Sequence, residues 1–287
     1  MKNEHVDEVS GVKTTGHEWD GIKELNNPLP RWWVWTFYAT IVWAIGYAIF
    51  YPAWPLINSA TSGVLGYSSR QELNRTLDEV AGEQAERVAA IADRPLTDIL
   101  ADEELRRFAA AAGAAAYKVN CSQCHGSGAQ GSPGYPNLND DEWLWGGDVD
   151  SIHQTIAHGV RFAGDDETRY SEMPAFGEML DRDQVRQAAA FVVSLSGEPS
   201  DPALASAGQQ VFADNCAACH GENGEGSPDL GAPDLADAIW LYGSSEDAIA
   251  QQVRAPKHGV MPGWAQRLGD TTVKQLAVFV HSLGGGE

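Results

Sequence analysis

Two pentapeptides, CSQCH at residues 121–125 and CAACH at residues 216–220, decide how this chain of 287 residues is interpreted. Together they contain all four of its cysteines. The pattern Cys-x-x-Cys-His predicts covalent attachment of a c-type haem, in which two thiols bond to the haem vinyl groups and the histidine binds the iron. We therefore expect two covalently bound haem c groups. The attachment residues are then Cys121, Cys124, Cys216 and Cys219.

The cysteines allow three other interpretations. A thioredoxin-like redox pair lies between a strand and a helix, and no strand-like alternation surrounds either motif. A zinc site needs two such pairs close enough to meet, and 95 residues separate these two. Structural disulfides are the third alternative. All three explain the adjacent histidines less well than haem attachment does.

The motifs lie within an internal repeat. WLWG at residues 143–146 matches WLYG at 240–243, and HGV at 158–160 matches HGV at 258–260. The matching order predicts two copies of one unit, at residues 104–198 and 202–287. The Gly- and Pro-containing segment 196–202 reads as the linker between them.

The iron ligands follow from the repeat. Beside the proximal His125 and His220, Met173 and Met261 stand before proline at equivalent places, and proline disfavours helix in the residue before it. Each methionine should therefore lie in a loop and offer its thioether as the sixth ligand. Within a repeat, 48 residues separate His125 from Met173 and 41 separate His220 from Met261.

Other residues near the ligands leave alternatives open. His158 and His258 are also repeated, so they could close the coordination, shape a loop or bind a haem propionate. Met179 has no counterpart in the second repeat and is expected to pack in the interior. Residues 161–170 form an insert in the first repeat, which is either a partner contact or an inert surface loop.

Residues 32–51 contain no charge over 20 positions, the length that crosses about 30 Å of hydrocarbon. Trp and Tyr residues lie at both ends, and Pro52 follows. We predict a cytoplasmic tail at 1–30 and a transmembrane helix at 31–57. The tail carries six acidic residues, which argues against a cleaved signal peptide. The weak Lys and Arg bias before the span keeps the N-terminus cytoplasmic.

Residues 58–103 form a connector between the span and the first haem-binding unit. Apolar residues at helical spacing predict one helix over residues 70–93, ended by Pro95, and a second after Thr97. This connector is either a spacer or a docking surface for a membrane partner.

The formal net charge of −21 argues against binding to nucleic acid or to anionic lipid. It favours a basic protein partner or serves solubility. No residue pattern indicates a catalytic site, so none is predicted.

Each repeat resembles a small class I c-type cytochrome domain. In that family an N-terminal helix with a glycine and an aromatic residue crosses a C-terminal helix. Gly113 with Tyr117, and Gly208 with Phe212, match those positions, and Phe191 and Phe279 are the expected partners on the C-terminal helices. The resemblance implies an all-α fold, with one N-terminal transmembrane helix followed by two tandem cytochrome c domains.

The whole chain resembles the dihaem c-type subunit III of bacterial cbb3-type cytochrome c oxidases. That family implies electron transfer from a periplasmic cytochrome c or the bc1 complex, through a monohaem subunit, to a catalytic haem-copper subunit. It also implies an inner-membrane anchor with periplasmic haem domains. A free membrane-anchored dihaem shuttle and a dihaem peroxidase are the alternatives.

Overall fold

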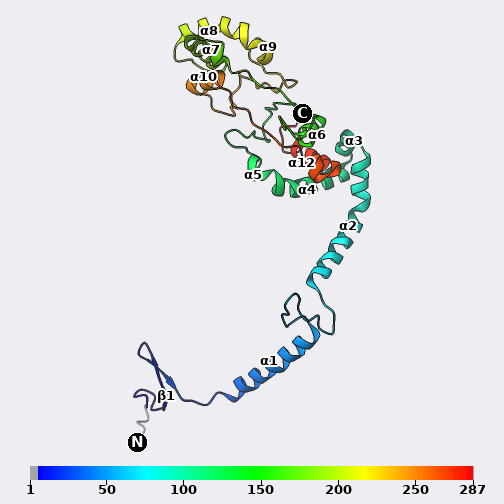
Figure 1. The fold of residues 1–287 in the computed structure, drawn as a ribbon, viewed down its shortest axis with the longest axis vertical. Coiled ribbons are helices and arrows are strands. Elements are labelled where there is room, and N and C mark those ends of the chain that lie inside the picture. Colours follow the sequence, from blue (N-terminus) through cyan, green and yellow to red (C-terminus); the bar gives the residue numbers. More distant parts are fainter. Residues whose placement is uncertain (1–5, 287) are drawn as a thin grey trace. The chain divides into compact units, whose positions relative to one another are not determined.

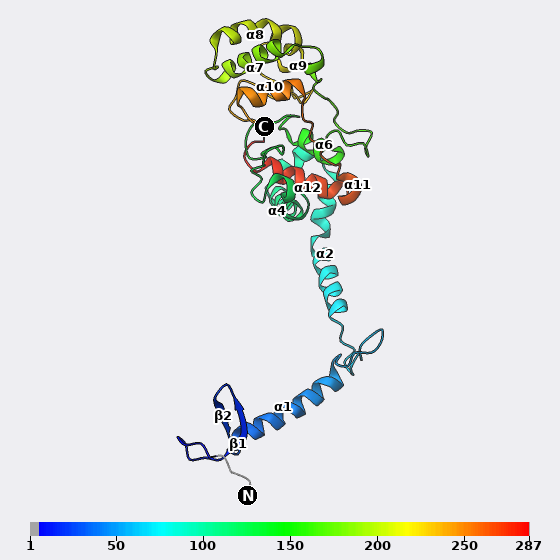
Figure 2. The same cartoon turned by 60° about the vertical axis from the view of Figure 1, so that its left-hand side comes forward.

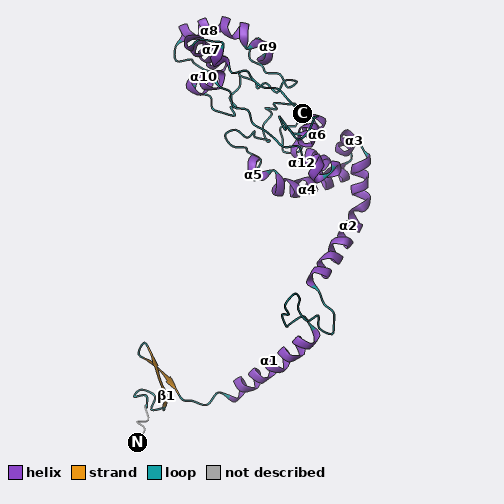
Figure 3. Ribbon diagram, viewed as in Figure 1, coloured by secondary structure: helices purple, strands orange, loops and turns teal. Residues whose placement is uncertain are grey.

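The structure is a computed structural model that describes residues 6–286, and it is mainly helical (Figure 3). Its contacts divide the chain into two units, which meet between Glu83 and Gln84. The first unit contains the membrane-compatible helix. The second contains both Cys-x-x-Cys-His motifs, so the two repeats lie in one compact unit.

A small hairpin in the N-terminal tail was not predicted. Strand β1 (Thr14–Trp19) pairs with β2 (Ile22–Leu25) in antiparallel fashion. Asp20 and Gly21 connect the strands, with positive φ angles of 50° and 83°. Asp-Gly favours this turn because both residues tolerate the left-handed region, and the dipeptide was the signal available in the sequence.

Helix α1 (Arg31–Phe50) is the one candidate membrane span among the described residues, and its side chains are not buried within the protein. The prediction of a single apolar helix near the N-terminus is confirmed. It ends at Phe50, and the backbone N–H of the capping residue Tyr51 donates to Tyr47 O, immediately before Pro52. Proline cannot continue the helical hydrogen bonding, so the helix stops there.

The two connector helices are also confirmed. Helix α2 (Ser69–Asp93) ends before Pro95, and the short α3 (Leu96–Ala101) follows it. Ile91 of α2 and Ile99 of α3 are fully buried in the second unit. The end of the connector therefore belongs to the core of that unit.

Side-chain caps set where several helices of the second unit begin. Asp102 accepts hydrogen bonds from the first-turn amides of α4, and Asp181 forms a capping box with Gln184 at the start of α7. Asp201 caps α8, where Pro202 fits the first turn because its missing N–H needs no partner there. The elements are α4 (Glu103–Asn120), α5 (Ser122–His125), α6 (Val149–His158), the 3-10 turn η1 (Phe176–Glu178), α7 (Arg182–Ser196), α8 (Pro202–Asn215), α9 (Ala217–His220), α10 (Glu246–Arg254), α11 (Ala265–Leu268) and α12 (Asp270–His281).

The second unit has two hydrophobic cores, and each combines parts of both repeats. In one core, α4 and α6 of the first repeat pack against α12 of the second. In the other, α7 of the first repeat packs against α8 and α10 of the second. Figures 1 and 2 show α4 beside α12, and α7 beside α8. Each core therefore contains helices from both residues 104–198 and residues 202–287.

A short connection explains part of this exchange. Helix α7 ends at Ser196 and α8 begins at Pro202, and helices joined by so few residues tend to pack side by side. Segment 196–202 thus joins two helices of one core. Because α7 packs against α8, α12 packs against α4, the first helix of the first repeat.

The glycines identified in the sequence lie at both helix crossings, with partners from the other repeat. A Cβ atom at Gly113 of α4 would collide with the carbonyl of Gln275 on α12 and lie 2.7 Å from Phe279 Cβ. Likewise, a Cβ atom at Gly208 of α8 would collide with Gln187 O and lie 2.9 Å from Phe191 Cβ on α7. The crossings need glycine because backbone meets backbone there.

We expect Gly113→Ala to lower the free energy of unfolding by about 1–3 kcal/mol, since the added methyl overpacks the crossing of α4 and α12. Gly82→Ala in α2 is the matched control, because a Cβ there meets nothing within 4 Å. That control should stabilise its helix by about 0.5–1 kcal/mol. Thermal unfolding followed by circular dichroism measures both, and equal effects of the two substitutions would contradict this packing.

Candidate haem-binding sites

Each Cys-x-x-Cys-His motif begins where the N-terminal helix of its repeat ends. The first cysteine caps α4 or α8, and the rest of the motif forms the single helical turn α5 or α9. Residues three or four positions apart share one side of a helical turn. Both cysteines and the histidine of a motif therefore face one cavity, as attachment to a single planar ligand requires.

The two histidines are buried and oriented in the same way. His125 and His220 are 9% and 8% exposed. The Nδ1 atom of each lies 3.0 Å from a proline carbonyl, Pro136 O and Pro233 O respectively. A carbonyl only accepts, so Nδ1 carries the proton and Nε2 is left as the free donor for a metal. Burial lowers the pKa of both imidazoles, which favours the neutral form that binds iron.

A glycine follows each histidine, at the point where the helical turn ends. Gly126 and Gly221 have φ angles of 83° and 78° with extended ψ, a conformation almost restricted to glycine. The segment that follows supplies the proline carbonyl. Pro136 and Pro233 were visible in the sequence only as repeated residues, and their contact with the histidines required the fold.

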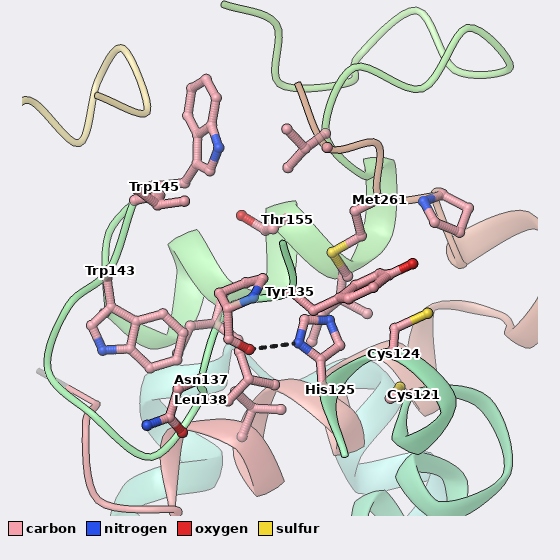
Figure 4. A pocket seen from close by; sticks show the side chains of 18 of the residues that line it. Cys121, Cys124, His125, Tyr135, Asn137, Leu138, Trp143, Trp145, Thr155 and Met261 are labelled. Carbon is pink, nitrogen blue, oxygen red and sulfur yellow. Dashed lines mark hydrogen bonds between the residues drawn. The ribbon is translucent and has the colours of Figure 1, made fainter. Parts of the chain in front are cut away.

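The cavity at the first motif has a volume of about 410 Å³, which lies in the range of small-molecule and cofactor sites. Cys121, Cys124 and His125 line one part of it, and Met261 of the second repeat lines another. Figure 4 shows the side chains of Met261 and His125 turned toward each other within this cavity.

The cavity at the second motif is smaller, about 220 Å³, and has the same set of donors. Cys216, Cys219 and His220 line it together with Met173 of the first repeat. Met173 packs on the core formed by α7, α8 and α10, and Met261 packs on the core of α4, α6 and α12. Both methionines lie outside helices, as the following prolines predict.

The pairing expected from sequence order is wrong. Met173 shares a cavity with His220, and Met261 shares one with His125. The chain crosses between the cores directly after Val160, where Val160 N donates to Met261 O at 2.9 Å and Met261 N donates to Val160 O at 3.0 Å. This bridge holds Met261 beside the end of α6 and commits residues 161–173 to the other core.

The structure separates the remaining candidates. His158 lines neither cavity, because its Nδ1 lies 3.1 Å from Asp165 Oδ2 and its Nε2 lies 3.2 Å from Glu167 Oε2. His258 is an exposed residue that also lines the second cavity. The expectation that Met179 packs in the interior is wrong. Its side chain is 61% exposed, because it follows the surface turn η1.

The cysteine thiols do not have the character of a redox pair. Burial, with a smaller effect of the neighbouring cysteine, raises the pKa of Cys121 and of Cys216 to about 11, whereas redox-active thiols have lowered pKa values. All four cysteines are free. Between residues 6 and 286, no three His, Cys, Asp or Glu side chains gather in a way that could hold a metal ion.

The residues present fit a covalently attached haem. Each cavity has two thiols for attachment, one buried histidine with a free Nε2 and one methionine thioether, which are the donors that cytochromes c use. In each motif the second cysteine is exposed and the first is more buried. One edge of each cavity therefore reaches the protein surface.

Comparison with known families decides the relationship. The family described as "Cytochrome C oxidase, cbb3-type, subunit III" matches residues 108–192 and again residues 203–280. The chain belongs to this subunit III family of cbb3-type cytochrome c oxidases. The family described as "N-terminal domain of cytochrome oxidase-cbb3, FixP" matches residues 11–58, which include the β hairpin and helix α1.

Full-length relatives agree with this membership of the subunit III family. The chain is 65% identical to the cbb3-type cytochrome c oxidase subunit FixPc of Rhizobium leguminosarum bv. viciae, over 100% of both chains. It is 63% identical to subunit FixP of Rhizobium meliloti, over 100% of this chain and 99% of the relative. Subunit CcoP of Cereibacter sphaeroides is 55% identical, over 96% of this chain and 95% of the relative.

Proposed function

We propose that this chain is the membrane-anchored dihaem electron-transfer subunit of a cbb3-type cytochrome c oxidase. The observation that carries the proposal is the pair of cavities, each with a complete Cys-x-x-Cys-His motif facing a methionine. Family membership over the full length and the single membrane-compatible helix support the same role. Electron transfer is then the function of the chain, and oxygen reduction belongs to a partner subunit.

Two haem c groups are proposed, one in each cavity. Cys121 and Cys124 would attach the first, and His125 and Met261 would bind its iron. Cys216 and Cys219 would attach the second, and His220 and Met173 would bind its iron. When bound, each haem supplies a one-electron redox couple whose potential a methionine ligand raises. The proline carbonyls hold the histidine rings in position, and mainly apolar side chains line both cavities.

The proposed orientation places the N-terminus in the cytoplasm and the haem-binding unit in the periplasm of a bacterial inner membrane. It is supported by Lys23 and Arg31 before the span and by the periplasmic attachment of haem c in bacteria. The proposed partners are a catalytic haem-copper subunit, a monohaem cytochrome c subunit, and a donor cytochrome c or bc1 complex. The net charge of −21 suits a basic donor.

The geometry bears on one of the two alternatives. A dihaem peroxidase needs an open or displaceable position at one iron, and a methionine shares each cavity with the proximal histidine. A free dihaem shuttle would have the same two cavities. The shuttle and the oxidase subunit differ only in their partners.

The haem content tests the proposed cofactors. The wild-type chain should carry two covalently bound haems, and Cys121→Ala combined with Cys124→Ala should leave one, because the second motif is unchanged. Haem staining after denaturing electrophoresis, with quantitation as the pyridine haemochrome, measures this. Two haems in the double variant would contradict the assignment. The same substitutions at Cys216 and Cys219 provide the matched comparison.

Copurification tests the proposed complex. A tagged full-length chain isolated from detergent-solubilised membranes should bring down a multispanning subunit that contains haem b and copper. A chain that retains residues 1–30 and the haem-binding unit but carries an unrelated apolar span in place of α1 serves as the control. Isolation of the wild-type chain as a single polypeptide with two haems would favour the free shuttle instead.

A further inference from the structure

Arg161 lies between the two proposed haem sites. It is one of four residues that line both cavities, and the other three are uncharged: Leu144, Leu241 and Gly259. The repeat places Arg161 directly after HGV at 158–160, where the second repeat has Met261 after HGV at 258–260. Arg161 thus begins the insert of the first repeat in sequence and lies at the boundary of the two cavities in space.

Hydrogen bonds to both repeats fix the Arg161 side chain. Its Nε donates to Gly259 O at 2.7 Å, and its Nη1 donates to Ser171 O at 2.9 Å. Its backbone has a φ of 52°, which is uncommon for a residue other than glycine. Such a conformation persists only where surrounding contacts impose it, and it often accompanies a functional position.

The guanidinium has donors left for a further ligand. It carries five N–H groups, and its Nη2 amino group makes no hydrogen bond to another residue in the described part of the chain. Each haem carries two propionate carboxylates, so two bound haems would bring four negative charges to this unit. Arginine binds carboxylates through paired N–H groups.

The other charges around the cavities make Arg161 the main counter-charge. Among described residues lining the first cavity, Arg161 is the one Lys or Arg, and Glu142 adds an acidic group. The second cavity has Lys257 as a further cation and two acidic residues, Glu172 and Asp234. A positive charge near a haem stabilises the reduced state, because reduction adds an electron.

We propose that Arg161 is a shared counter-charge that binds haem propionates from both cavities and raises the reduction potentials of both haems together. This inference rests on the proposed dihaem function. It assigns Arg161 a positioning and electrostatic role in electron transfer. It also gives a role to the start of the insert at 161–170, where the chain passes from one core to the other.

The test is a potentiometric titration of the full-length, haem-loaded chain in detergent, followed by the haem c absorption. Arg161→Gln should lower the midpoint potential of both haems by about 28 to 59 mV. That shift corresponds to about a three- to tenfold change in the equilibrium between the oxidised and reduced forms of each haem. Arg161→Lys keeps the charge and should retain wild-type midpoints. A shift in one haem or in neither, or an equal shift in Arg161→Lys, would overturn the proposal.

Arg169→Gln is the matched control, because Arg169 is a second partly buried arginine of the same insert. Arg169 donates to Ser151 O, packs over Trp145 and lines neither cavity. Arg169→Gln should shift the midpoint potentials less than Arg161→Gln does. If Arg169→Gln shifted the potentials of both haems as much as Arg161→Gln does, a specific role for Arg161 would be contradicted. Haem content and the charge-transfer band of methionine-ligated ferric haem are measured for each variant.

Arg161→Met serves if Arg161→Gln loses haem, because Met keeps an apolar stem while it removes the charge and the two hydrogen bonds to Gly259 O and Ser171 O. Loss of haem in all Arg161 variants would show that the residue holds the fold, and would overturn the proposal. The wild-type titration separates this inference from the proposed function. If the wild-type chain lacks two haems, the proposed function fails first.

Discussion

The pair of backbone hydrogen bonds between Val160 and Met261 is the contact on which the rest of the haem-binding unit depends. It joins the end of α6, in the first repeat, to the segment just before α11, in the second repeat. Gly159 makes the approach possible, because a Cβ there would collide with Met261 O. A nearby amide, Trp264 N, also donates to the carbonyls of Ile156 and Ala157 at 3.0 Å.

This bridge determines which residues share a core and which share a cavity. With Met261 held beside α6, α12 packs against α4. The ring centroids of Tyr117 and Phe279 then lie 5.4 Å apart. The remaining halves form the second core, in which Phe191 and Phe212 are 5.1 Å apart. Neither proposed haem site can then be complete without both repeats. The two sites are expected to fold together and to share electrostatic surroundings.

Local signals in the sequence predicted much of this structure. The Cys-x-x-Cys-His motifs, the non-helical Met-Pro pairs, the connector helices and the apolar helix all follow from residue types at fixed spacing. The Asp-Gly turn of the N-terminal hairpin was also readable. The exchange of helices between the repeats could not be predicted from the sequence. The helix with Gly113 and the helix with Gly208 could each cross either α7 or α12, as far as their residues show. The choice depends on long-range contacts and on the five residues between α7 and α8.

The exchanged pairing of histidine and methionine is the central claim, and a chain that carries only the first haem tests it most directly. In the background Cys216→Ala with Cys219→Ala, we compare Met261→Leu with Met173→Leu by the charge-transfer band of methionine-ligated ferric haem. The structure predicts that Met261→Leu abolishes the band and that Met173→Leu retains it. Loss of the band in Met173→Leu, with retention in Met261→Leu, would show that each repeat binds its own haem and would contradict the account.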